Sequence, residues 1–235
     1  MADNRVKDMP DDLVGAAVLF DLDGTLVDTA ADLAASMNHA LGAAGLAPAP
    51  AESVRHLVGH GARRMILRGY ELSAGRIPSD AETDEALARF LDHYEANIAV
   101  HSRPFDGAVE LIESFRARGA RMAICTNKRE GMAKLLIETL GLSSLFEVIV
   151  GADTASAPKP DPAPVTLCLR ETGAQRAVFI GDSDTDIRAA RAAGLPSFIA
   201  SFGYGPLTLS ADATGLFDGY IELGSMIENA LTEGT

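Results

Sequence analysis

Short apolar runs alternate with longer amphipathic segments along most of this chain. Each run is continuously apolar and bounded by polar residues, glycine or proline, which is typical of strands covered on both faces. The runs are 16–20, 122–125, 146–150, 177–180 and 197–200. Between them apolar residues recur at helical spacing, and one such segment ends at Gly194, a favourable residue after a helix. This alternation predicts an α/β fold with a doubly wound parallel sheet.

One long segment departs from this alternation. From about Thr29 to His101 no strand is evident, and apolar residues form two helical stripes. The stripes are Leu33, Met37, Leu41 and Ala44, and Leu87, Leu91, Tyr94 and Ile98. We therefore predict an inserted α-helical cap subdomain over residues 29–102, within a core made of residues 1–28 and 103–235. Its hinges are expected near Thr29 and near 102–104.

Composition and charge restrict the partners of the protein. The 235 residues are 47% hydrophobic and 23% charged, an ordinary globular composition. Net charge is −13, from 20 Lys and Arg against 33 Asp and Glu, which disfavours nucleic acid and anionic membranes as partners. Any site for an anionic phosphate therefore needs local positive charge. With no signal-like apolar segment at the N-terminus and no membrane-length apolar stretch, we expect a soluble, cytoplasmic protein, either monomer or homodimer.

Two carboxylates follow the first apolar run, in Asp21-Leu22-Asp23-Gly24-Thr25. Ligands of parallel sheets bind at the carboxyl ends of strands, so both acids should face a crevice. Like charges this close repel one another unless a cation lies between them. A solvated acidic turn is the other explanation, but it gives no reason for this spacing.

A second acidic cluster follows the fourth run, where residues 181–186 read Gly-Asp-Ser-Asp-Thr-Asp. Helix capping accounts for some of these acids. A calcium-binding loop does not fit, because its sixth position is Ile187 instead of glycine and its twelfth is Ala193 instead of glutamate. We interpret Asp182 as part of an oxygen-rich site for Mg²⁺, supported by Asp186.

Two weaker signals lie at other strand ends or loops. Thr126 and Asn127 follow the second run and offer a hydroxyl and an amide, although helix capping explains them as well. Lys159 lies between prolines in Ala-Pro-Lys-Pro-Asp-Pro, which stiffens the backbone around it. A lone loop lysine is usually a solvated charge, but here it could supply the counter-charge for a phosphate.

Taken in order, these segments resemble the four signature segments of the haloacid dehalogenase superfamily of phosphohydrolases. The matching residues are Asp21-x-Asp23-Gly24-Thr25, Thr126, Lys159-Pro160 and Gly181-Asp182-Ser183-x-x-Asp186. The resemblance spans about Val18 to Ser201 and includes a helical cap inserted after the first strand.

The resemblance implies a role for each matching residue. Asp21 is expected to be the nucleophile and Asp23 the general acid/base, while Thr126 and Lys159 bind the phosphoryl group. Mg²⁺ is expected on the Asp21 side chain, the Asp23 backbone carbonyl and Asp182. The expected reaction is hydrolysis of a small phosphate monoester through an aspartyl-phosphate.

A loop within the predicted cap, residues 57–64, reads Leu-Val-Gly-His-Gly-Ala-Arg-Arg. It is either a glycine-rich turn with exposed charges or, as in the phosphoglycolate phosphatases that it resembles, a loop facing the active site. In the second case His60, Arg63 and Arg64 could bind a carboxylate on the substrate. We therefore expect 2-phosphoglycolate or a similar small ester as substrate.

Other functions within the same resemblance stay open. Phosphatases of sugar phosphates and nucleotides share every catalytic residue, and a sugar-phosphate mutase also uses an Asp-x-Asp pair. Dehalogenases and phosphonate hydrolases lack the second aspartate, and the latter need a cap lysine, which is absent between Val27 and Arg121. A non-catalytic binding regulator is least favoured, because the whole signature is intact.

Overall fold

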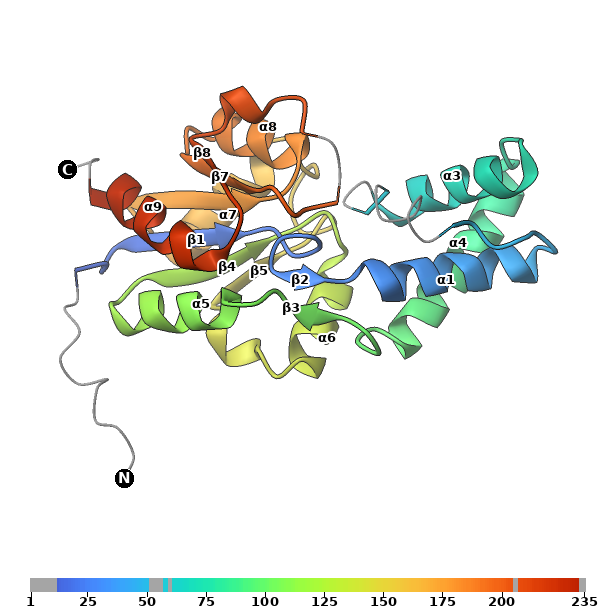
Figure 1. Ribbon diagram of the computed structural model, residues 1–235, viewed down its shortest axis with the longest axis horizontal. Helices are drawn as coiled ribbons and strands as arrows, with labels where there is room; N and C mark the ends of the chain where they lie inside the picture. The colour runs from blue at the N-terminus through green and yellow to red at the C-terminus, as the bar shows by residue number, and fades with distance from the viewer. Residues whose placement is uncertain (1–11, 51–56, 59–60, 205–206, 233–235) are drawn as a thin grey trace.

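The computed structural model of the protein describes residues 12–50, 57–58, 61–204 and 207–232 (Figure 1). Its centre is a six-stranded sheet in the order β5-β4-β1-β6-β7-β8, in which each neighbouring pair is parallel. The strands are β1 (Ala16–Phe20), β4 (Arg121–Cys125), β5 (Val148–Val150), β6 (Arg176–Gly181), β7 (Ser197–Ala200) and β8 (Gly215–Phe217). The predicted α/β fold with a parallel sheet is confirmed.

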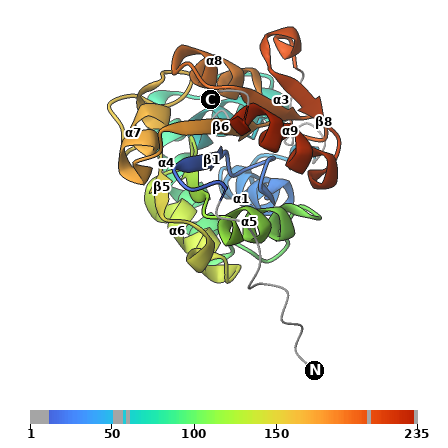
Figure 2. The ribbon, with the colours of Figure 1, turned by 90° about the vertical axis from the view of Figure 1, so that its left-hand side faces the viewer.

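Helices cover both faces of the sheet, as the continuously apolar strands require. On β1, Val18 and Phe20 pack into one apolar core, whereas Ala17 and Leu19 pack into the other. The first core is covered by α5 (Ala108–Ala117), α6 (Glu130–Thr139) and α9 (Tyr220–Thr232), and the second by α7 (Ala163–Thr172) and α8 (Asp184–Ala192). Figure 2 shows these two groups of helices on opposite sides of the sheet.

Three of the described helices between β1 and β4 form a group of their own beyond the carboxyl ends of the strands (Figure 1). They are α1 (Ala30–Ala43), α3 (Ala62–Ala74) and α4 (Asp80–Ala96). The predicted stripe of α1 is buried at Leu33, Met37 and Leu41. Gly69 of α3 faces this stripe, and a Cβ there would lie 3.1 Å from the Met37 sulfur. Glycine thus allows α3 to pack closely against α1.

The chain enters and leaves this helical segment at one place. Strands β2 (Val27–Asp28) and β3 (Arg103–Pro104) pair antiparallel there. The buried carboxylate of Asp32 accepts hydrogen bonds from the backbone N–H of His101 (3.0 Å) and of Ser102 (2.8 Å). These hydrogen bonds therefore hold together the two chain segments that connect the helical segment to the rest of the protein.

The structure differs from the predicted elements mainly at short segments. The run 146–150 forms a strand only over Val148–Val150, and the 3-10 helix η2 (Ser143–Leu145) lies just before the run. Strands β2, β3 and β8, the 3-10 helix η3 (Ser210–Asp212) and helix α9 were not predicted. Strands of two or three residues are too short to show a period, whereas α9 carries a readable one at Leu223, Ile227 and Leu231.

Candidate active site

Three neighbouring strands bring the acidic and polar residues together. Asp21 follows β1, Thr126 follows β4 and Asp182 follows β6, and β1 lies between the other two strands. The carboxyl ends of adjacent parallel strands meet at one edge of the sheet, so these side chains converge. Lys159 joins them from the loop before α7.

Asp21 is buried, with 5% of its surface exposed, and its two oxygens differ. Oδ1 accepts a hydrogen bond from its neighbour's backbone, the N–H of Leu22 (2.7 Å), and lies 3.0 Å from Lys159 Nζ. Oδ2 makes no hydrogen bond or ion pair with a residue that the structure describes. Burial raises the pKa of Asp21 from 3.8 to about 6, against the lowering effect of Lys159, and Asp186 adds to the rise. One oxygen is thus held in place while the other is available to a ligand.

Asp182 is held beside Asp21 by backbone contacts and close packing. Its Oδ2 accepts a hydrogen bond from the Tyr204 N–H (3.0 Å). Two glycines make room for it, because a Cβ on Gly24 would lie 2.5 Å from its Oδ2 and one on Gly203 would lie 2.4 Å from its Cβ. Gly24 also has a φ of 83°, which favours glycine. Burial, with the nearby charges of Asp186 and Asp21, raises the pKa of Asp182 well above its usual value.

Lys159 is almost wholly buried and connects two carboxylates. Its Nζ lies 3.0 Å from Asp21 and 2.6 Å from Asp186, and 5.2 Å from the centre of the Phe179 ring. Burial alone lowers the pKa of Lys159, but Asp186 and Asp21 more than offset this, so its pKa lies above the ordinary value. The lysine is therefore a permanent cation within the acidic cluster.

The acidic cluster has the charge of a divalent cation site. Asp21, Asp182 and Asp186 each offer an oxygen, and these oxygens lie within 4.8 Å of one another. Lys159 balances one of the three negative charges, so two remain when all three acids are ionised. Hard cations prefer such carboxylate oxygens, and burial raises the pKa values of Asp21 and Asp182, so a nearby cation would favour their charged forms. The residues present fit a divalent metal ion.

Asp186 and Asp184 have distinct contacts. Asp186 Oδ2 accepts hydrogen bonds from the Ser183 hydroxyl (2.6 Å) and backbone N–H (3.1 Å), which closes the first turn of α8. Asp184 instead accepts hydrogen bonds from the backbone N–H of Thr208 (3.0 Å) and Leu209 (2.9 Å). Asp186 thus supports the cluster, while Asp184 fixes the loop after β7.

Asp23 does not belong to this carboxylate cluster, because its side chain is engaged by a lysine that sequence reasoning missed. Lys128 Nζ lies 2.8 Å from both carboxylate oxygens of Asp23, and the Thr29 hydroxyl donates a hydrogen bond to Oδ1 (2.7 Å). Burial lowers the pKa of Lys128, but Asp23 and Tyr94 together raise it above its ordinary value. The sequence feature that could have pointed to Lys128 is its position, two residues after Thr126 at a strand end.

Thr126 and Asn127 lie beside the cluster and order its loops. The Thr126 hydroxyl accepts a hydrogen bond from the Lys128 N–H (3.1 Å), so its own proton is free for another acceptor. Asn127 Nδ2 donates to the Lys159 carbonyl (3.0 Å), while its buried Oδ1 has no partner among the described residues. Asn127 therefore positions the lysine loop through the backbone.

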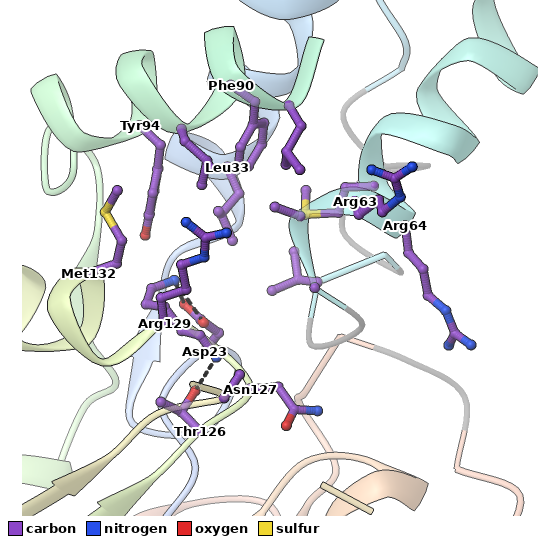
Figure 3. Close-up of a pocket in the computed structure, with 18 of the residues that line it drawn as sticks. Asp23, Leu33, Arg63, Arg64, Phe90, Tyr94, Thr126, Asn127, Arg129 and Met132 are labelled. Carbon is purple, nitrogen blue, oxygen red and sulfur yellow. Dashed lines mark hydrogen bonds and ion pairs between the residues drawn. The ribbon is translucent and has the colours of Figure 1, made fainter. Parts of the chain in front are cut away.

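A cavity of about 500 Å³ lies between the strand ends and the helical segment. Asp21 lines it from the core. Figure 3 shows Asp23 and Thr126 on the same core side, and Leu33, Phe90 and Tyr94 on the side of the helices. Such a volume suits a small ligand.

The residues predicted to bind substrate from the cap loop differ in where the structure places them. Arg63 and Arg64 also line the cavity. In Figure 3 the Arg64 side chain extends away from Asp23. Arg63 pairs with Asp84 at 2.5 Å. His60 lies outside the described residues, so its contact with a substrate stays a prediction.

Comparison with known proteins adds to this geometry. Residues 18–200 match the haloacid dehalogenase-like hydrolase family. A phosphoglycolate phosphatase from Caulobacter vibrioides is 45% identical over 82% of each chain. One from Mesorhizobium japonicum is 47% identical over 80% of this chain and 83% of its own.

None of the described helices is long and apolar enough to cross a membrane. Solved structures with a similar fold are also phosphatases or related proteins by name. A predicted phosphoglycolate phosphatase from Haemophilus somnus superposes with a TM-score of 0.82 at 28% identity, over 89% of this chain and 96% of that one. CbbY from Rhodobacter sphaeroides, solved in complex with phosphate, has a TM-score of 0.77 at 27% identity, over 92% and 99%. The chain therefore belongs to the haloacid dehalogenase-like hydrolase family and is a phosphoglycolate phosphatase-like enzyme.

Proposed function

We propose that the protein hydrolyses 2-phosphoglycolate to glycolate and phosphate through an aspartyl-phosphate on Asp21. The observation that carries the proposal is the buried cluster of Asp21, Asp182, Asp186 and Lys159, whose Asp21 opens into a cavity for a small ligand. The choice of substrate is supported by the similar proteins, which are named phosphoglycolate phosphatases.

In this proposal Asp21 Oδ2 attacks phosphorus, since Oδ1 is already held by Leu22 and Lys159. The phosphorus–oxygen bond to glycolate breaks, and Asp23 delivers the proton that the leaving oxygen needs. Water then attacks the aspartyl-phosphate, gives its proton to Asp23 and releases inorganic phosphate. Splitting the reaction into two displacements lowers the barrier of each.

Lys159 and Thr126 bind the phosphoryl oxygens in this proposal, as a cation and as a hydroxyl donor. Mg²⁺ would be held by the Asp21 side chain, the Asp23 backbone carbonyl and Asp182. When bound, it neutralises charge on the transferring phosphoryl group. The backbone contact leaves the Asp23 carboxylate, which Lys128 and Thr29 hold in place, to act on the leaving oxygen.

We further assign residues 29–102 as a cap on a core of residues 1–28 and 103–235. The group of α1, α3 and α4 lies over the cavity, and both crossings lie at the β2–β3 pair. Closure of such a cap excludes water and strengthens each charged contact inside.

Removing divalent metal should silence phosphate release. We expect EDTA to abolish hydrolysis of 2-phosphoglycolate, Mg²⁺ to restore it and Ca²⁺ to restore it poorly, because Ca²⁺ takes more ligands at longer distances. Phosphate release in each condition is the measurement. Full activity in chelator would contradict the assignment.

Mg²⁺ should also stabilise the fold, and more so at higher pH. The pKa of Asp21 rises from 3.8 to about 6 on folding, so the metal-free fold loses stability as pH rises through that window. Above it, the ionised acid binds metal and recovers the loss. The rise in Tm with Mg²⁺ is expected to be larger at about pH 7.5 than at about pH 5. An equal rise at both values would show that the metal binds elsewhere.

Asp23→Asn should lower activity most on esters with poor leaving groups. Glycolate leaves as an alkoxide and needs a proton, whereas 4-nitrophenolate does not. We expect about a 10²- to 10⁴-fold loss of kcat on 2-phosphoglycolate and a much smaller loss on 4-nitrophenyl phosphate. The ratio of the two losses is the readout, because it cancels any effect on folding. Equal losses on the two esters would mean that Asp23 acts only structurally or through the metal.

A further inference from the structure

The cavity contains a cation that the sequence did not suggest. Arg129 lies at the N-cap of α6, directly after Lys128. Figure 3 shows its side chain projecting into the space between Asp23 below and Leu33 and Tyr94 above. It comes from the core, whereas Arg63 and Arg64 lie in the first turn of α3.

The other cations that line the cavity are paired or directed elsewhere. Arg63 forms ion pairs with Asp84 (2.5 Å) and Asp80 (3.4 Å), and Lys128 is shared between the two oxygens of Asp23. Arg64 extends away from Asp23 in Figure 3. The Arg129 guanidinium makes no hydrogen bond or ion pair with any described residue. It is therefore the guanidinium best placed to bind an anion in the cavity.

A second polar group lies next to it. Tyr94 of α4 is 2% exposed, and its buried hydroxyl makes no hydrogen bond of normal geometry with a described residue, although the Lys128 ammonium is close enough to act on its pKa. Figure 3 shows the hydroxyl end directed down into the cavity, beside the Arg129 side chain. Burial raises the pKa of Tyr94 to about 12, so the hydroxyl keeps its proton and acts as a donor. Buried hydroxyls are normally hydrogen-bonded, so an acceptor atom of a ligand in the cavity would satisfy this one.

We propose that Arg129 and Tyr94 bind the carboxylate of the substrate's leaving group, and that Arg129 selects phosphate esters with an anionic leaving group. The inference rests on the proposed phosphatase function and places recognition on these residues instead of His60 and Arg64. A guanidinium offers a carboxylate two parallel N–H donors, and the tyrosine hydroxyl supplies a third. Because Arg129 belongs to the core and Tyr94 to the helical segment, the bound carboxylate connects the two.

The test compares 2-phosphoglycolate with 2-hydroxyethyl phosphate, an ester of the same length that ends in a neutral hydroxyl. Arg129→Met should lower kcat/KM for 2-phosphoglycolate by about 10- to 100-fold, the value of a hydrogen-bonded charge, and leave the neutral ester unchanged. Tyr94→Phe should give a smaller loss with the same selectivity. Arg129 is exposed and has no side-chain partner in the described structure, so its replacement should not disturb folding.

Arg64→Met is the matched control, because it removes a cation from the same cavity. It should lower kcat/KM equally, or not at all, on the two esters. Equal loss on both esters in Arg129→Met, or a selective loss in Arg64→Met alone, overturns the inference. If the wild-type enzyme hydrolyses both esters with equal kcat/KM, anion recognition is overturned and the phosphatase function stands. Hydrolysis of neither ester, in the presence of Mg²⁺, overturns the proposed function itself.

Discussion

Asp21→Asn is expected to reduce kcat for phosphate release by at least about 10⁴-fold, as removal of a catalytic nucleophile does. The amide is not nucleophilic toward phosphorus and is a poor ligand for a cation. The position is also central in the sheet, because Asp21 directly follows β1, the strand that pairs with β4 on one side and β6 on the other.

The same substitution should leave the fold intact. Asparagine has the shape of aspartate, and its carbonyl oxygen can still accept the Leu22 N–H and face Lys159. It also removes a buried charge that folding disfavours, as the raised pKa of Asp21 shows. Phosphate release and thermal unfolding should be measured together. Asp92→Asn, on an exposed aspartate of α4, is the control and should change neither. Activity of the Asp21 variant within about tenfold of wild type would exclude the aspartyl-phosphate mechanism.

Lys159→Met is expected to damage both activity and stability. It would leave Asp21 and Asp186 buried without the cation that they share. Removing one partner of a buried ion pair costs about 3–5 kcal/mol of unfolding free energy, and losing one preorganised charge contact at a phosphoryl group costs about 10²- to 10³-fold in kcat. Urea unfolding at neutral pH measures the first loss and phosphate release the second.

The matched control for this lysine is Lys134→Met. Lys134 is exposed and pairs with Glu130 on α6, so its loss should change stability by less than about 1 kcal/mol. Mg²⁺ should recover part of the stability of the Lys159 variant, because it supplies positive charge next to Asp21. A Lys159 variant as stable as the Lys134 variant would show that the buried lysine is not needed as a counter-charge.

The sheet and most of the cluster were predictable because they follow from one rule. Apolar runs identify buried parallel strands, and polar residues just after such strands meet at one edge of the sheet. Asp21, Thr126 and Asp182 satisfy this rule in three runs that prove to be adjacent. Asp186 could be placed with them because it lies in the first turn of the following helix.

The cavity side of the site was not predictable in the same way. Lys128 and Arg129 are two cations at a helix start, a pattern that usually means a solvated surface. Lys128 becomes significant only because folding places Asp23 within 2.8 Å of it, and Tyr94 only because its ring lies 4.8 Å from the Lys128 Nζ. These partners are far apart in sequence, so the position of Lys128 near a strand end could not identify them.

The pairing of β2 with β3 has a consequence for how the chain folds. Strand β1 is synthesised before both of its sheet partners, β4 and β6, so its apolar surface can be covered only after these distant segments have been made. Long-range pairing of this kind slows folding, because a large loop must be closed first. If α1, α3 and α4 assemble early, the Asp32 contacts with His101 and Ser102 bring the two ends of their segment together. The early assembly then shortens the effective loop between β1 and β4. The helices that cover the cavity in the folded enzyme would therefore also speed the pairing of β1, the strand that Asp21 follows.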